Sequence, residues 1–127
     1  FAGVVLVNGH GGNGATLRRA VDLLHREGRR VLLVHCGVPG GDSHGGRTET
    51  SLMLHLAPQS VRRDRAEPGD TRPWSEIGPE VVERGVAAVS PNGVLGDPTG
   101  ASAEEGERLL AAICERVRGE VAGWADD

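Results

Sequence analysis

The sequence has very few aromatic residues, few cysteines and no long apolar segment. Aromatic residues make up 2% of its 127 residues and tyrosine is absent, so aliphatic residues and alanine must fill the core. No stretch approaches the roughly 20 apolar residues that a membrane-spanning helix requires. No succession of charged, apolar and small residues indicates a signal peptide. We therefore expect a cytoplasmic protein with no membrane partner, of a length typical of one domain.

The charge pattern and the cysteines exclude further classes of protein. The formal net charge is -4, and the basic residues are scattered among acidic ones rather than grouped in a stripe, so nothing favours a nucleic-acid partner. Cys36 and Cys114 match no zinc-binding or redox spacing. We expect both thiols to be buried as small apolar side chains in a reducing compartment.

The first third of the sequence predicts a strand, a helix and a second strand. The apolar runs 1–7 and 31–34 are typical of strands buried on both faces. The intervening segment is expected to be a helix with Asn13 as N-cap and Gly28 as its stop. This order predicts parallel pairing through a right-handed crossover. The apolar face of the helix repeats at three- and four-residue spacing in Leu17, Ala20, Val21 and Leu24.

The sequence begins inside the first apolar run, at Phe1, without a polar lead-in. A strand that is buried on both faces needs neighbours. We therefore expect residues 1–127, as a fragment or a processed chain, to be the C-terminal part of a single, larger α/β domain.

Polar loops and shorter apolar segments alternate in the rest of the sequence. A helix is predicted over 48–56, with Leu52 and Leu56 on one side. Residues 59–79 are polar and broken by prolines, which indicates a surface excursion. The apolar segment 85–89 is expected to be a further strand.

A last helix is predicted after a second turn. Ser102 and Glu105 fit a capping box. The helix is expected to pack one apolar stripe against the sheet. The whole pattern predicts an α/β fold with a mostly parallel central sheet flanked by helices. The stripe repeats every four residues in Leu109, Ile113, Val117 and Val121.

His10 lies in a glycine-rich turn directly after the first predicted strand. Open α/β sheets bind their ligands at the carboxyl ends of parallel strands. The flanking glycines let a metal ion or a substrate approach the backbone closely. The same position also suits a loop histidine that only hydrogen-bonds nearby carbonyl groups.

The loop after the second predicted strand carries Asp42, His44 and Glu49 within eight residues. Since parallel strands end at the same edge of a sheet, an imidazole from the first loop and a carboxylate from this loop could share a divalent ion such as zinc, manganese or iron. The remaining imidazole could then carry a proton. Asp42 fits a simple turn equally well. His35, at the end of the second strand, also stays a candidate.

Two further histidines, His25 and His55, lie on predicted helices and are expected to be structural. The sheet edge therefore offers about two good ligands. A hydrolytic metal site needs several ligands and an open position for water. We infer that the sequence alone is too poor in ligands for a two-metal centre.

Four blocks of the sequence resemble the creatininase family. Val7–Asn13 is similar to the central signature of the family, and Asp42–Ser51 is similar to its second signature. Gly93–Pro98 and Ala101–Gly106 resemble its closing segment. The blocks occur in the order of the family and run nearly end to end, apart from the excursion around Trp74.

Within the family, Arg84–Ser90 leading into Gly93–Pro98 looks most like the mycofactocin-system branch. That resemblance implies a peptidase that cleaves a modified precursor peptide and releases its C-terminal product, derived from valine and tyrosine. Two alternatives stay open. One is an amidohydrolase of a small cyclic amide or a formamide, and the other is a non-catalytic module that binds metal or serves in assembly.

The resemblance also implies roles for individual residues. His10 corresponds to a metal ligand, and His44 to the catalytic histidine that helps proton transfer to the departing amine. Creatininase carries a glutamate ligand two residues after its signature histidine, where this sequence has Gly12. We infer that Glu49 supplies a carboxylate ligand instead. Backbone groups expected to bind substrate are those of Gly11, Gly12, Asn13, Gly45 and Gly46.

The implied cofactors are two divalent ions per complete subunit, of zinc, iron or manganese. The family's remaining ligands, a Glu-x-His pair and a bridging aspartate, belong to an N-terminal motif that this sequence does not contain. The implied partners are a peptide substrate and further copies of the chain in a homo-oligomer, which is hexameric in creatininase.

Overall fold

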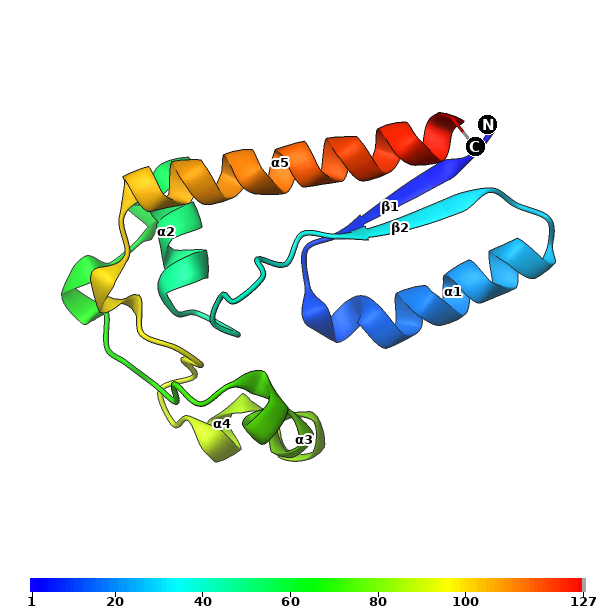
Figure 1. Ribbon diagram of the computed structural model, residues 1–127. Helices are drawn as coiled ribbons and strands as arrows, with labels where there is room; N and C mark the ends of the chain where they lie inside the picture. The colour runs from blue at the N-terminus through cyan, green and yellow to red at the C-terminus, as the bar shows by residue number, and fades with distance from the viewer. Residues whose placement is uncertain (127) are drawn as a thin grey trace. The chain divides into compact units, whose positions relative to one another are not determined.

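The two strands form a parallel pair connected by a helix, as the sequence predicts. Strand β1 (Val4–Asn8) pairs with β2 (Val31–His35) in parallel register, from Val4 beside Val31 to Asn8 beside His35. Helix α1 (Gly14–Arg26) connects them and runs back along the pair (Figure 1). Gly28 adopts a φ of 71°, a left-handed conformation that lets the chain turn from the helix into β2.

The computed structural model describes residues 1–126, in which the two strands are accompanied by five α-helices. Four short 3₁₀ turns lie between them, of which η1 (Gly11–Asn13) and η4 (Pro98–Gly100) border segments discussed below. None of the helices within these residues combines the length and the apolar character that crossing a bilayer requires. The remaining helices are α2 (Arg47–Leu56), α3 (Trp74–Arg84), α4 (Val86–Val89) and α5 (Ala103–Asp126).

The chain divides into two compact units. Unit 1 comprises Phe1–Gly37 together with the chain from Ala112 onward, and unit 2 comprises Val38–Ala111. The α/β class, with a parallel sheet and flanking helices, is confirmed, although the sheet has two strands within residues 1–126.

In unit 1, the last part of α5 contacts the chain at both ends of β2. The Arg30 guanidinium lies 4.8 Å from the ring centroid of Trp124 and donates to the Trp124 carbonyl oxygen. Arg116 donates to the carbonyl oxygens of His35 and Gly37, at 2.8 and 2.9 Å. The predicted apolar stripe of this helix is half-buried.

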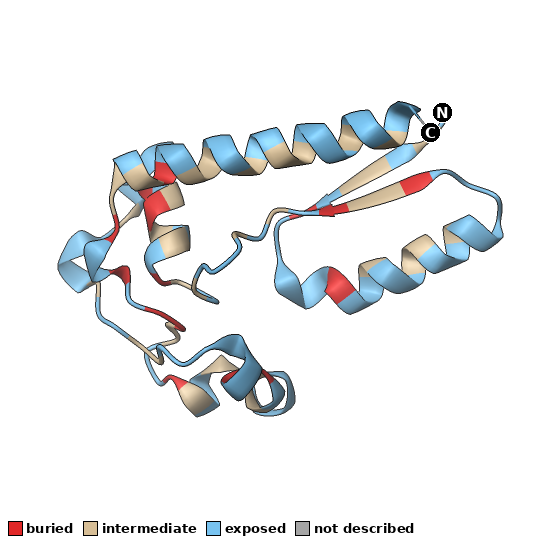
Figure 2. Ribbon diagram, in the orientation of Figure 1, coloured by how far each residue is buried: buried red, intermediate tan, exposed pale blue. Residues whose placement is uncertain are grey.

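The prediction that both strands are buried on both faces is wrong for β1. Val31 and Val34 of β2 are buried, but Val4 and Val7 of β1 are 45% and 57% exposed (Figure 2). Each strand pairs only with the other within the described residues, and α1 packs mainly against β2, so the side chains of β1 are less covered. Apolar runs report on composition and not on which neighbours are present.

Unit 2 has a small core around α2, α3 and the segment before η4. Leu54, Ile77 and Leu95 are buried there, as are the hydroxyl-bearing side chains of Ser51 and Ser90. Figure 2 shows buried segments where α2 meets the start of α5 and others near α3 and α4. The 11-residue helix α3, which contains Pro79, begins within the segment predicted to be an irregular excursion.

Several local predictions need correction. Residues 85–89 do not form a strand: Gly85 has a φ of 83° and turns the chain into the single helical turn α4. On α2, Leu54 is buried and Leu56 is 59% exposed, so the expected apolar side is rotated. Cys114 is exposed on α5 rather than buried, while Cys36 is half-buried. Asn13 makes no side-chain cap to α1, because its amide points back to Asn8.

Candidate active site

The first candidate loop is organised by Asn8, the last residue of β1. Its side chain is 5% exposed, and its Oδ1 accepts from the backbone N–H of His10 at 3.2 Å and from Asn13 Nδ2 at 3.4 Å. Its Nδ2 lies 3.1 Å from Nδ1 of His35, the paired residue of β2. A single buried amide therefore connects the two strand ends and fixes the start of the turn that carries His10.

His10 is exposed, and its imidazole lies over Gly12. A Cβ atom at position 12 would stand 2.8 Å from Nε2 of His10, closer than real Cβ contacts allow. A Cβ at Gly11 would meet nothing within 4 Å. A glycine at position 12 is thus a steric requirement of this histidine conformation.

The second candidate loop is fixed by backbone pairing and by Asp42. His44 and Leu95 form an antiparallel bridge, with N–O distances of 3.2 and 2.7 Å. The Asp42 carboxylate accepts from the backbone N–H groups of Arg47 and Thr48, the first residues of α2. The structure supports the interpretation of Asp42 as a turn residue rather than a metal ligand. Its carboxylate caps the start of α2 and shapes the turn before it.

His44 and Glu49 lie together at the start of α2. Nδ1 of His44 is 3.6 Å from Oε2 of Glu49, and the same oxygen accepts from the backbone N–H of Gly45 at 2.7 Å. Both side chains are half exposed, at 54% and 52%. The loop therefore presents an imidazole and a carboxylate to solvent side by side, which suits proton transfer or metal binding.

The glycines of this loop have different local environments. Gly45 has a φ of 63°, which explains the absence of a side chain by backbone conformation. Gly46 is buried against the Asp42 carboxylate and the Cα of Gly96. The role of both residues in substrate binding stays a prediction.

The frame beneath this loop is an ionic and hydrogen-bonded cluster between α2 and the start of α5. Nε of Arg47 donates to both oxygens of Glu105, at 3.0 and 2.8 Å, and the buried Ser51 hydroxyl donates to Oε2 at 2.8 Å. The hydrogen bond from Arg47, followed by that from Ser51, lowers the pKa of the Glu105 carboxyl below its usual value. The pKa of Arg47 is raised by the same pairing.

The capping box predicted at Ser102 is half formed. The Glu105 backbone N–H donates to the Ser102 hydroxyl at 3.1 Å. The reciprocal bond is absent in the described structure because the Glu105 carboxylate binds Arg47 and Ser51, and the Ser102 N–H donates to the Ser51 hydroxyl at 3.1 Å. The sequence spacing predicts that the Glu105 side chain caps α5, but in the structure it joins α5 to α2.

The donors fit a divalent metal in kind but not in number. Imidazole and carboxylate groups suit zinc, manganese and iron. Glu49 has one oxygen bound to Gly45 N–H, and a carboxylate has a second oxygen to offer. Within residues 1–126, no group of three or more histidine, cysteine, aspartate or glutamate side chains is arranged to hold a metal ion. The two loops lie in different units, and each by itself offers part of a ligand set.

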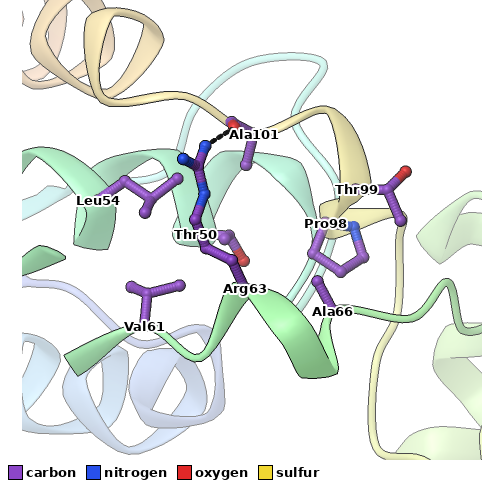
Figure 3. A pocket seen from close by; sticks show the side chains of 8 residues that line it. All are labelled: Thr50, Leu54, Val61, Arg63, Ala66, Pro98, Thr99 and Ala101. Atoms are coloured by element: carbon purple, nitrogen blue, oxygen red, sulfur yellow. Dashed lines mark hydrogen bonds between the residues drawn. The ribbon is translucent and has the colours of Figure 1, made fainter. Parts of the chain in front are cut away.

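Unit 2 also contains a cavity of about 120 Å³ (Figure 3). Its walls are largely apolar, and the Arg63 side chain crosses it to donate to the Ala101 carbonyl oxygen at 3.1 Å. None of the site residues predicted from the sequence lines it. The lining residues are Thr50, Leu54, Val61, Arg63, Ala66, Pro98, Thr99 and Ala101.

Sequence reasoning did not anticipate the contacts that support the candidate residues. The bridge between His44 and Leu95 joins segments about 50 positions apart, and no spacing rule indicates it. The pairing of Asn8 with His35 had a usable signal, since both are polar residues that end apolar runs expected to be parallel.

The parallel β–α–β unit and its glycine-rich loops define an α/β protein with candidate ligand residues after the strands. Residues 1–120 match the family model described as creatininase, creatinine amidohydrolase. The chain belongs to the creatininase family.

Similar proteins include the mycofactocin precursor peptide peptidases of three mycobacteria. The chain is 50% identical to that of Mycobacterium tuberculosis (strain CDC 1551 / Oshkosh) over 121 residues, which cover 95% of this chain and 48% of the relative. Identity is 49% to the Mycobacterium ulcerans protein, with coverages of 95% and 48%. Identity is 47% to the Mycolicibacterium smegmatis protein, with coverages of 98% and 50%. The chain thus spans about half the length of these relatives.

Solved structures of the family share the fold. A putative creatinine amidohydrolase from Bacteroides fragilis superposes with a TM-score of 0.72 at 27% identity, covering 97% of this chain and 54% of that one. A creatininase gives a TM-score of 0.74 at 28% identity, with coverages of 94% and 54%. A mutant creatininase described as of the Zn–Zn type gives 0.68 at 30% identity, with coverages of 89% and 52%.

Proposed function

We propose that this chain is part of a metal-dependent amidohydrolase that hydrolyses a C–N bond in a peptide, namely a modified mycofactocin precursor peptide. The observation that carries the proposal is the identity of 47% to 50%, over at least 95% of the chain, to peptidases named for that substrate. The exposed His44 and Glu49 pair supports it, because hydrolysis of an amide needs a group that protonates the leaving nitrogen.

In this proposal the residues of the chain have separate tasks. His10 and Glu49 are ligands for the divalent ions, of zinc, iron or manganese, two in each complete subunit. Such an ion, when bound, polarises a carbonyl group and lowers the pKa of water. His44 donates a proton to the departing amine. The backbone around Gly11, Gly12 and Gly45, together with Asn13 and Gly46, borders the space for the substrate.

The complete protein is proposed to be a cytoplasmic homo-oligomer. The exposed apolar side chains of β1, among them Val4 and Val7, are compatible with further packing partners. A hexamer is the largest oligomer that we expect. Light scattering of the purified protein measures the number of subunits.

Two other functions have specific support. The solved relatives described as creatininase or creatinine amidohydrolase favour a small cyclic amide as substrate, at identities of 27% to 30%. The lack of a three-ligand group within residues 1–126 favours a non-catalytic metal-binding or assembly module for the isolated chain.

The test joins this chain to the half of the Mycobacterium tuberculosis relative that it does not match. The fusion, loaded with zinc, is incubated with the precursor peptide and separately with creatinine, and the products are identified by mass spectrometry. We expect cleavage of the peptide by the fusion and its loss in His44→Ala. Turnover of creatinine alone would support the cyclic amide, and turnover of neither substrate would support the assembly module.

A further inference from the structure

Asn8 and His35 form a polar pair at the carboxyl ends of the two strands, and the proposed function gives neither side chain a role. They are register partners in the parallel pair. Asn8 is buried, whereas His35 is exposed. The backbone is also joined here, because Cys36 N–H donates to the Asn8 carbonyl oxygen at 2.8 Å.

The hydrogen bonds of Asn8 determine which way its amide points. A backbone N–H can only donate, so the Asn8 atom 3.2 Å from the His10 nitrogen is the amide oxygen. Asn13 Nδ2 approaches the same atom, at 3.4 Å. The NH₂ group of Asn8 therefore faces His35, with its nitrogen 3.1 Å from Nδ1.

This orientation fixes the tautomer of His35. An amide NH₂ can only donate, so Nδ1 of His35 accepts and carries no proton. The proton of the neutral ring must then be on Nε2. In this tautomer Nε2 has no lone pair for a metal ion and acts as a hydrogen-bond donor. Moving the proton to Nδ1 would remove the bond to Asn8 and leave a buried NH₂ group without an acceptor.

The main chain that follows the two strand ends is open at several glycines. Cβ atoms at Gly9, Gly11 and Gly37 would meet no atom within 4 Å. These glycines follow the two strand ends, where His35 also lies, all within unit 1. A ligand can therefore approach this main chain, and the imidazole of His35 is itself exposed.

We propose that His35 is a substrate-positioning residue whose Nε2–H donates to a carbonyl or carboxylate oxygen of a peptide, and that Asn8 sets it in the donor tautomer. The assignment rests on the proposed function, since it takes a peptide as the ligand of this sheet edge. In this assignment His35 binds substrate and is not a metal ligand. The buried amide of Asn8 then sets the tautomer of His35, besides holding the turn that carries His10.

The first test determines the tautomer by ¹⁵N NMR of the imidazole nitrogens in alkaline buffer, in which free imidazole is neutral. We expect a protonated Nε2 in the native chain. Asn8→Asp keeps an oxygen for His10 N–H but replaces the NH₂ group with an acceptor, so it should move the His35 proton to Nδ1. His25 is the internal control: its Nε2 lies 3.0 Å from the Val31 carbonyl oxygen, and its tautomer should stay unchanged. A native His35 protonated on Nδ1 would overturn the proposal.

The second test measures binding without hydrolysis. N-acetyl-trialanine, as the free acid and as the amide, is titrated into the native chain and into three variants, and chemical shifts are followed. His35→Gln retains a nitrogen donor near the Nε2 position and should bind nearly as well as the native chain. His35→Ala and Asn8→Asp should bind about three- to tenfold more weakly, the effect of losing one uncharged hydrogen bond.

The two probes identify the acceptor. Binding of the free acid alone assigns a carboxylate, and equal binding of both assigns a backbone carbonyl. Unchanged affinity in His35→Ala, or no binding of either probe to the native chain, would overturn the assignment. Neither readout needs turnover, so failure of this inference is distinguishable from failure of the proposed peptidase activity.

Discussion

The Cα of Gly106 on α5 lies against the backbone carbonyl of Ser51 on α2, so closely that a side chain at position 106 would overlap it. The Cβ of His55 would be 2.9 Å from the same added atom. This approach brings Glu105 within reach of Arg47 and Ser51. His44 and Glu49 lie at the start of α2, the helix that makes this contact with α5.

Gly106→Ala should therefore destabilise the protein. Because the added methyl group meets backbone, which cannot rotate away, we expect the free energy of unfolding to fall by about 2–3 kcal/mol. Gly119→Ala on the same helix is the matched control, since its Cβ would meet nothing within 4 Å. It should raise the free energy of unfolding by up to about 1 kcal/mol, through helix propensity. Urea unfolding measures both, and equal effects would contradict the close contact.

Stability should decrease in acid partly because of Glu105. Its pKa is lowered in the folded state by Arg47 and Ser51, so the unfolded chain binds a proton more readily. The stabilisation is present above the ordinary pKa of 4.5 and is lost as the pH falls through the lower folded value. In urea unfolding, the difference between native protein and Glu105→Gln should shrink over that range. The exposed Glu107→Gln is the control, and a difference independent of pH would contradict the pairing.

The position of His10 should depend on Gly12 and not on Gly11. Gly12→Ala places a methyl group where the imidazole lies, so the ring must move. If His10 is a ligand, the dissociation constant for zinc should rise by about 10- to 100-fold, as when a supporting contact of a metal ligand is lost. Gly11→Ala should leave it unchanged. Isothermal titration of the fusion protein with zinc measures both variants, and equal affinities would contradict the steric argument.

Asp42 should act as the cap of α2. Asp42→Ala removes the acceptor of the Arg47 and Thr48 N–H groups, and we expect a loss of about 1–2 kcal/mol of stability. Asp42→Asn retains one acceptor oxygen, so its loss of stability should be smaller. Hydrogen exchange of the two amides, followed by NMR, reports directly on the cap. Unchanged protection in Asp42→Ala would show that the helix start is held by other contacts.

The fold was largely predictable where local patterns determine it. The pairing of β1 with β2 and the face of α1 that packs on it follow from apolar periodicity, and Gly28 marks the turn between them. Residues 85–89 were misassigned because a short apolar run suits a strand or a helical turn equally, and the φ of Gly85 decided between them. The exposure of β1 depends on neighbours, which periodicity does not report.

The sequence singles out the candidate residues but not the contacts that hold them. His10, His44 and Glu49 stand out as imidazole and carboxylate groups in glycine-rich loops. That His44 pairs with Leu95, and that Gly12 makes room for His10, depend on chain segments meeting in space. Motif spacing contains no information on such meetings.

We infer that this chain contributes ligands to a two-metal hydrolase. The most direct test is elemental analysis of zinc, iron and manganese in the fusion with the unmatched half of the Mycobacterium tuberculosis relative, compared with its His10→Ala variant and with the chain alone. We predict two equivalents of divalent metal in the fusion, fewer in His10→Ala, and less than two in the chain alone. A fusion that binds no metal, or binds it equally with alanine at position 10, would contradict the account.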